Sequence, residues 1–272
     1  MMRLLCWNVQ WCRGLDGEVD PARIAAHTRA AGADVACFQE IASNFPDLPG
    51  SKGEDQPVAL WKDLPEYEPV VGWSVDVPSR TGMRMRFGNM ILSRLPVQRV
   101  LRHSLPWPAA PDVPSMPRTA VEAVVQAPSG PLRIITTHLA NNAPAHRAAQ
   151  VRRLKEILSE GHAERKLVEE PGPFRTYPAG SSTILCGDFN MPAHDPLHAE
   201  LLGSGLVDAW RALHPGKPHP PTFRLHERRE GVAPYCCDFI FVTPDLAPRL
   251  RAIRIDADNR ASDHQPVSVE LL

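Results

Sequence analysis

The stretch ILCGDFNMP, residues 184–192, has the pattern of a buried strand that ends abruptly in polar residues. Apolar residues lead into Gly187 and Asp188, and Asn190 follows two positions later. Glycine and aspartate form turns, so this pair is typical of many strand ends. Side chains alternate along a strand, and the alternation predicts that Asp188 and Asn190 lie on the same side. Such a pair indicates a functional site only if other strands end in the same way.

Most of the other apolar segments also have polar residues near one end. These residues are Asn8 in RLLCWNV (3–9), Glu40 in DVACFQE (34–40), His138 in LRIITTHL (132–139), Asp238 in CDFIFVT (237–243), and Asp263 and His264 before PVSVELL (266–272). Taken singly, each has an ordinary interpretation as a turn, surface or sheet-edge residue. Their recurrence in one chain favours a site where several loops gather at the strand ends.

Capping and turn signals predict the remaining elements. Asp20-Pro21 predicts a helix start, with the helix running to Ala31 and ending at Gly32. Pro144 and Asp195-Pro196 predict two further helix starts. Residues 89–94 and 97–103 are expected to form a hairpin around Leu95-Pro96, and 119–127 and 132–139 a second one. Loops are expected at 43–57, 104–117 and 161–182. The pattern predicts two packed sheets covered by helices, in a single domain over residues 1–272.

Composition restricts the class of protein. The chain has 272 residues, 43% hydrophobic and 22% charged, as in ordinary soluble globular proteins. A net charge of -1 gives no global signature of nucleic-acid binding, so any polyanion must meet a local patch. No apolar run approaches the roughly 18 to 20 residues of a membrane span, and no signal peptide is recognised. The six cysteines contain no C-x-x-C pair, which favours a reducing cytoplasm over a disulfide framework. No protein partner can be inferred.

The motifs WN, QE, GN-x-I-x-SR-x-P, THL, GDFN, DFIF and SDH occur in this order between Asn8 and His264. In this order they resemble the endonuclease/exonuclease/phosphatase superfamily, and GDFN together with SDH is the specific part of the signal. The resemblance implies an α+β fold, a four-layer α/β/β/α sandwich of two mixed sheets flanked by helices. It also implies a divalent-metal-dependent phosphoester hydrolase with its site at one edge of the two sheets.

The resemblance implies a metal centre with Glu40 as principal ligand, completed by Asn8 and Asp263. Oxygen ligands of this kind suit Mg²⁺ or Mn²⁺. The catalytic residues implied are His138, Asp188, Asn190, Asp238 and His264. Asp188 is the expected general base, and Asn190 is expected to hold the phosphate or the attacking water.

The two histidines have different expected roles. His264 is expected to contact the phosphoryl oxygen, with Asp238 fixing its ring and raising its pKa. His138 occupies the position of a histidine in deoxyribonuclease-like members. No counterpart of the glutamate that pairs with it there is found between residues 76 and 112, so its role as leaving-group acid stays open.

Arginines suggest where a phosphate binds. Residues 79–103 contain six arginines and no acid, and Arg84 and Arg86 are candidate phosphate contacts, as is Arg118 farther along the chain. The alternative for the first two is a solvated basic hairpin, and for Arg118 a structural ion pair. Trp107 is placed for stacking on a base. The first functional hypothesis is a nuclease. A phosphatase or phosphodiesterase acting on a small or lipid-derived ester is second, because the nearly neutral chain offers little surface for a nucleic-acid backbone.

Overall fold

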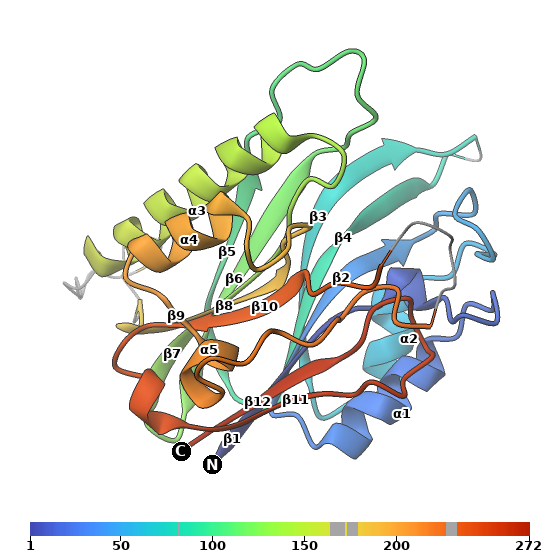
Figure 1. Cartoon of the computed structure of the whole chain (residues 1–272). Helices are drawn as coiled ribbons and strands as arrows, with labels where there is room; N and C mark the ends of the chain where they lie inside the picture. The colour runs from blue at the N-terminus through green and yellow to red at the C-terminus, as the bar shows by residue number, and fades with distance from the viewer. Residues whose placement is uncertain (81, 164–171, 173–178, 227–232) are drawn as a thin grey trace.

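Two six-stranded mixed sheets lie face to face in the computed structural model, which describes residues 1–80, 82–163, 172, 179–226 and 233–272 (Figure 1). The first sheet has the order β11-β12-β1-β2-β4-β3, with β1 Met2–Asn8, β2 Val35–Ser43, β3 Glu68–Pro78, β4 Arg84–Ser93, β11 Leu250–Ile255 and β12 Val267–Leu271. The second has the order β5-β6-β7-β8-β10-β9, with β5 Val97–Leu105, β6 Arg118–Ala127, β7 Gly130–His138, β8 Ser182–Asp188, β9 Val207–Asp208 and β10 Asp238–Val242. β1 and β2 are parallel, as are β7 and β8.

Helices cover the outer face of each sheet (Figure 1). α1 (Pro21–Ala31) and α2 (Gln56–Asp63) pack on the first sheet, and α3 (Pro144–Ala163) and α4 (Pro196–Gly203) on the second. A short helix, α5 (Ala209–Leu213), packs against β10 and β11, and 3₁₀ turns occupy Gln10–Cys12 and Ala247–Arg249. The arrangement confirms the four-layer sandwich.

Three buried apolar clusters hold these layers together. Side chains such as Cys6 of β1 and Ile184 of β8 meet between the sheets. Trp7, the next residue of β1, points the other way, toward α1 and α2. Leu185 similarly faces α3 and α4. Both faces of the central strands are therefore buried, which explains their nearly continuous apolar runs.

The predicted helix starts are confirmed. The Asp20 side chain accepts hydrogen bonds from the backbone N–H groups of Ala22 and Arg23, and α1 ends at Gly32 with φ +59°. Asp195 caps α4 in the same way. A cap of this kind contributes about 1 kcal/mol. Asp55 caps α2, an element the sequence analysis did not predict.

The hairpin predicted around Leu95-Pro96 is wrong. β4 pairs with β2 on one side and β3 on the other, whereas β5 pairs with β6 in the second sheet. The chain therefore crosses between sheets at this point. A strand whose two edges are already occupied cannot pair with the next strand, and no local signal shows that occupancy. The second predicted hairpin, β6 with β7, is confirmed.

Other boundaries also differ from expectation. β2 does not end at Glu40 but continues to Ser43, and β3 was not predicted. In the predicted loop 161–182, α3 extends to Ala163, β8 begins at Ser182, and residues 164–171 and 173–178 lie outside the described residues. Among the described residues, no helix has the length and apolar character needed to cross a bilayer.

Candidate active site

The polar strand ends meet at one edge of the two sheets. In the second sheet His138 lies opposite Asp188, and Asp188 lies opposite Asp238, so three neighbouring strands place these residues in one row. Asn8, at the end of β1 in the other sheet, donates from Nδ2 to Asp188 Oδ2 at 3.0 Å and to Glu40 Oε1 at 3.2 Å. Asn8 thus joins the contributions of the two sheets.

The glycine of GDFN is required by close packing, and the aspartate after it forms a turn. Gly187 has φ +148°, and a Cβ at this position would lie 1.9 Å from the carbonyl oxygen of Thr137. Only glycine allows β7 to approach this closely. Asp188 Oδ1 then accepts the backbone N–H of Asn190 at 2.9 Å, and Asn190 has φ +49°. A side-chain-to-backbone turn therefore sets the relation between Asp188 and Asn190, whereas strand alternation was expected to do so.

Glu40 sits in a β-bulge within β2. The pairing of β2 with β4 shifts register between Phe38 and Ile41, and Glu40 has φ +61°. Such a conformation costs about 1 to 3 kcal/mol and is characteristic of functional positions. Burial, and then the nearby Asp263 carboxylate, raises the pKa of Glu40 to about 7. Its side chain remains 19% exposed, so a small ion can reach it.

The residues expected at the metal centre fit a hard divalent cation. Glu40 and Asp263 are close enough for their charges to interact, and their oxygens are the donors that Mg²⁺ and Mn²⁺ prefer. Asn8 Oδ1 accepts the backbone N–H of Gln10 at 3.0 Å, which turns the amide nitrogen toward the carboxylates. In this orientation Asn8 links Glu40 and Asp188, and its role as a metal ligand remains a prediction. Gln10 also donates to Asp263 Oδ2 at 2.9 Å.

His264 is held by Asp238. Its Nδ1 lies 2.9 Å from Asp238 Oδ2, which also accepts the Thr222 hydroxyl at 2.6 Å. Burial by itself lowers the pKa of His264, but the Asp238 and Asp188 carboxylates outweigh that effect and raise the pKa to about 10. The imidazole is therefore positively charged at neutral pH, with Nε2 3.7 Å from Asp188 Oδ2.

His138 is a neutral imidazole in the same site. Burial, and then the charge of Arg118, lowers the pKa of His138 well below its usual value. Asn190 Nδ2 donates to the carbonyl of Leu139 at 2.9 Å, which identifies it as the amide nitrogen, and it lies 2.9 Å from His138 Nε2. Nε2 must then accept, so the ring proton is on Nδ1, 3.9 Å from Glu40 Oε1.

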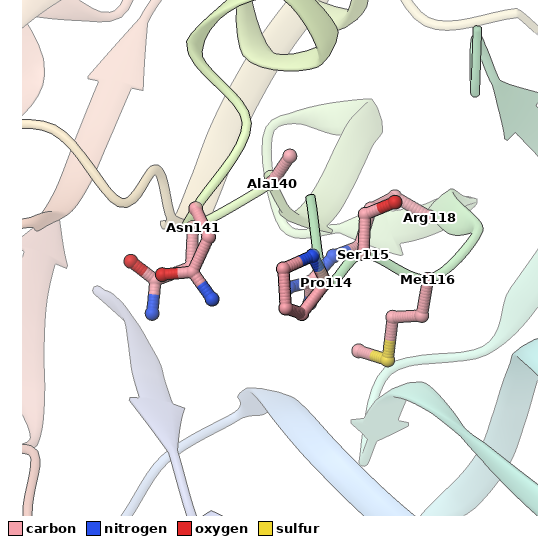
Figure 2. Close-up of a pocket in the computed structure, with 7 residues that line it drawn as sticks. Pro114, Ser115, Met116, Arg118, Ala140 and Asn141 are labelled. Atoms are coloured by element: carbon pink, nitrogen blue, oxygen red, sulfur yellow. The ribbon is translucent and has the colours of Figure 1, made fainter. Parts of the chain in front are cut away.

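Arg118 is a buried cation beside this cluster. The residue is 8% exposed, and its Nε and Nη1 have no hydrogen-bond partner among the described residues. It lines a cavity of about 300 Å³, with Asn141 on one side and Pro114 and Met116 on the other (Figure 2). A buried guanidinium with unpaired N–H groups is costly unless an anion binds there.

Arg84 and Arg86 lie on β4 and pair with Asp76 of β3, at 2.7 Å and 3.4 Å. The arginine-rich stretch contains no acid, but the neighbouring strand supplies one. Both side chains remain partly exposed, 48% and 38%. Their role as phosphate contacts remains a prediction.

Sequence reasoning missed three residues that support the site. Gln10 follows the Trp-Asn motif directly, which was a usable signal. Thr222 holds Asp238, and the Phe223 ring lies 4.5 Å from that of His264. Both lie in a segment without a recognisable motif, HPGKPHPPTF (214–223), so only the folded chain shows their contacts.

A four-layer sandwich with carboxylates and a carboxylate-paired histidine at one edge of both sheets defines a metal-dependent phosphoester hydrolase. The chain belongs to the endonuclease/exonuclease/phosphatase family, whose model matches residues 5–264. Among curated proteins, no sequence matches it significantly.

Solved structures show the same fold. An endonuclease/exonuclease/phosphatase from Beutenbergia cavernae DSM 12333 is 25% identical, with a TM-score of 0.75 over 98% of this chain and 70% of that one. A mannosyl-6-phosphatase from Bacteroides thetaiotaomicron VPI-5482 is 17% identical, with a TM-score of 0.71 over 100% of both chains. A 3′ phosphatase from Neisseria, bound to a product DNA hairpin, is 21% identical, with a TM-score of 0.66 over 100% of both chains.

Proposed function

We propose that this protein is a nuclease that hydrolyses nucleic-acid phosphodiesters with Mg²⁺ or Mn²⁺. The observation that carries the proposal is the position of Asp188. It is 1% exposed, its Oδ1 accepts the Asn190 backbone N–H, and its Oδ2 faces Asn8, His138 and His264. A carboxylate held in this way at the edge of both sheets is suited to orient and deprotonate an attacking water.

Glu40 and Asp263, with Asn8 beside them, are the proposed metal-binding residues. When bound there, the ion polarises the phosphoryl group and neutralises part of its charge. The strained backbone of Glu40 and its raised pKa support this role, because a dication offsets the repulsion between buried carboxylates.

His264 stabilises negative charge on the phosphoryl oxygens. It carries a proton on each ring nitrogen at neutral pH, so it cannot act as the general base. Nδ1–H is fixed by Asp238, which leaves Nε2–H to donate to substrate. The neutral His138 has Nε2 occupied by Asn190, and it therefore orients Asn190 and does not protonate the leaving group in this arrangement.

Arg118 is the proposed partner of the substrate phosphate. Its buried, unpaired N–H groups match the oxygens of a phosphate, and the cavity beside it gives access. Arg84 and Arg86 on β4 are proposed to contact phosphates farther along a nucleic acid. Trp107, which is 52% exposed, is proposed to stack on a base.

A phosphomonoesterase acting on a small or lipid-derived ester is the second candidate. The cavity of about 300 Å³ next to Arg118 favours it, since its volume suits one compact group. Two proteins of the same fold are named as phosphatases, one for a mannosyl 6-phosphate and one for DNA 3′ phosphate. A DNA 3′ phosphate is a phosphomonoester on a nucleic acid, so its hydrolysis would join the reaction of the second candidate to the substrate class of the first.

A substrate panel separates the two candidates. Plasmid DNA, abasic duplex, single-stranded RNA, a 3′-phosphorylated DNA hairpin, bis-nitrophenyl phosphate, mannose 6-phosphate and phosphoinositides are each incubated with Mg²⁺, Mn²⁺ or EDTA. The nuclease proposal requires metal-dependent cleavage of the phosphodiesters between nucleotides in DNA or RNA. The affinity for the nucleic acid should fall steeply as the salt concentration rises. If the only product is inorganic phosphate, the nuclease proposal is wrong and the phosphomonoesterase takes its place.

The Asp188→Asn variant serves as the matched control in every reaction. It removes the proposed base while keeping the shape of the side chain, and we expect turnover to fall about 10²- to 10⁴-fold. Cleavage that survives unchanged in this variant belongs to a contaminant or to a different mechanism.

We also propose a reducing, cytoplasmic setting. All six cysteines are free thiols and all are buried, which supports this assignment.

A further inference from the structure

Three side chains of the kind that bind transition metals form a second cluster, on the outer side of the second sheet. His198 lies on α4, Asp208 ends β9 and caps α5, and His219 lies in the segment that follows α5. One ligand atom from each lies within 4.8 Å of the other two. Phe239, which follows Asp238 on β10, turns its ring toward this cluster, 4.9 Å from that of His198.

Both imidazoles point at the same carboxylate oxygen. Asp208 Oδ2 lies 2.9 Å from His198 Nε2 and 2.8 Å from His219 Nε2. The other oxygen, Oδ1, accepts the backbone N–H of Arg211 at 3.1 Å, which fixes the orientation of the carboxylate. The three side chains are 1%, 2% and 8% exposed, in the order His198, Asp208 and His219. The donor atoms are therefore preoriented and nearly closed off from solvent.

Aromatic rings surround the cluster. Phe241 lies 5.3 Å from the His198 ring, and Trp210 lies 6.1 Å from the His219 ring. A carboxylate in such apolar surroundings requires positive charge or several hydrogen bonds to compensate it. Two imidazole N–H groups supply hydrogen bonds, and a dication supplies charge as well.

We propose that His198, Asp208 and His219 bind one zinc ion that anchors the segment 214–222. Two imidazole nitrogens and one carboxylate oxygen are a typical zinc donor set, whereas Mg²⁺ prefers oxygen alone. Zinc bonds of about 2.0 to 2.2 Å imply donor atoms about 3.3 Å apart in a tetrahedron, so the two distances from Asp208 Oδ2 to the imidazole nitrogens lengthen by about 0.5 Å on binding. Each imidazole binds zinc through Nε2 and carries its one ring proton on Nδ1, and water takes the fourth position.

The anchored segment leads directly to the catalytic histidine. Thr222 donates to Asp238, and Phe223 packs against His264. Zinc at His219 holds the middle of this segment, and the contact of Thr222 with Asp238 holds its C-terminal end. The role proposed for the ion is to hold this segment; the ion is chemically distinct from the oxygen-ligated ion of the carboxylate cluster, and the proposal does not depend on which phosphoester is cleaved.

Cobalt spectroscopy tests this site independently of activity. The full chain, carrying no polyhistidine tag, is stripped of metal and titrated with Co²⁺ in excess Mg²⁺, which occupies the oxygen site. We expect one equivalent of Co²⁺ to give the intense visible absorption of a four-coordinate ion, and Zn²⁺ to abolish it. Zinc should also raise the Tm of the stripped protein by several degrees.

Matched variants locate the ion. His219→Gln should lose the cobalt absorption, whereas His214→Gln, a change at a histidine whose ring contacts Trp210 outside the cluster, should keep it. His264→Gln should keep it as well. Absence of a zinc-displaceable signal in the wild-type protein would show a hydrogen-bonded triad only and overturn the proposal. Loss of the signal in His264→Gln, or its persistence in His219→Gln, would do the same.

Discussion

Two buried histidines in one site have opposite charge states. His264 faces the carboxylate of Asp238, and the raised pKa keeps it protonated at neutral pH. His138 faces the amide of Asn190, and burial keeps it neutral. Both lose hydration by a similar degree of burial, 4% and 5% exposed, so burial does not explain the difference. The charged neighbours account for it: the carboxylates of Asp238 and Asp188 raise the pKa of His264, whereas the guanidinium of Arg118 adds to burial in lowering that of His138.

The largest effect is expected from removing the charged member of this pair. His264→Ala should lower turnover about 10²- to 10⁴-fold, because the phosphoryl oxygens lose a charged hydrogen-bond donor. Steady-state rates at saturating Mg²⁺ measure it, and circular dichroism checks the fold. His214→Ala, a change at a half-buried histidine outside the site, provides the control and should leave turnover unchanged. Wild-type turnover in His264→Ala would remove His264 from the mechanism.

The affinity of the Glu40 site for Mg²⁺ should depend on pH. Because the pKa of Glu40 is raised to about 7 in the metal-free protein, protons compete with Mg²⁺ below that pH. The apparent Mg²⁺ affinity should fall about tenfold per pH unit below about pH 7. Glu40→Gln should bind Mg²⁺ more weakly, with this dependence flattened. Calorimetric titration at several pH values measures both. An unchanged Mg²⁺ affinity in Glu40→Gln would place the ion elsewhere.

Neutralising Asp238, the partner of His264, should bring the charge state of His264 closer to that of the neutral His138. Asp238→Asn keeps an acceptor for Nδ1–H but removes the negative charge, so the pKa of His264 should fall, and turnover at neutral pH about 10- to 100-fold. In the wild type, the raised pKa means that stability from His264 is full below about pH 6.5 and is lost as pH rises toward about 10. NMR titration of the ring and pH-dependent unfolding test this. An unchanged pKa would show that Asp188, not Asp238, controls the charge.

The smallest effect is expected at the neutral histidine. His138→Gln replaces one neutral hydrogen-bonding group by another, so turnover should change by less than about tenfold. Rates over a range of pH measure the effect, with Asn190→Ala as a companion that removes the amide facing His138. A loss of 10²-fold or more, together with loss of one limb of the pH profile, would instead identify His138 as the leaving-group acid.

Several features could be predicted from sequence because they depend on local chemistry. The helix caps at Asp20 and Asp195, and the apolar runs of β1, β7 and β8, follow from backbone hydrogen bonding and strand burial. The family motifs identified the residues that meet at the site, and the structure brings Asn8, Glu40, Asp188 and His264 together.

Other features depend on contacts between distant segments. The pairing of β4 on both edges ruled out the expected hairpin, and Asp76 pairs with arginines that looked unpaired in the sequence. The bulge at Glu40 depends on the register between β2 and β4. Neither edge occupancy nor register can be deduced from one strand alone.

By itself, the sequence determined which side chains are present at the strand ends and which elements begin at a capping aspartate, because both follow from residue type and near neighbours. Only the tertiary structure decided the protonation of the two histidines and the burial of Arg118. A pKa depends on the charges and amides that the fold brings within a few ångströms, and those come from strands far apart in the chain.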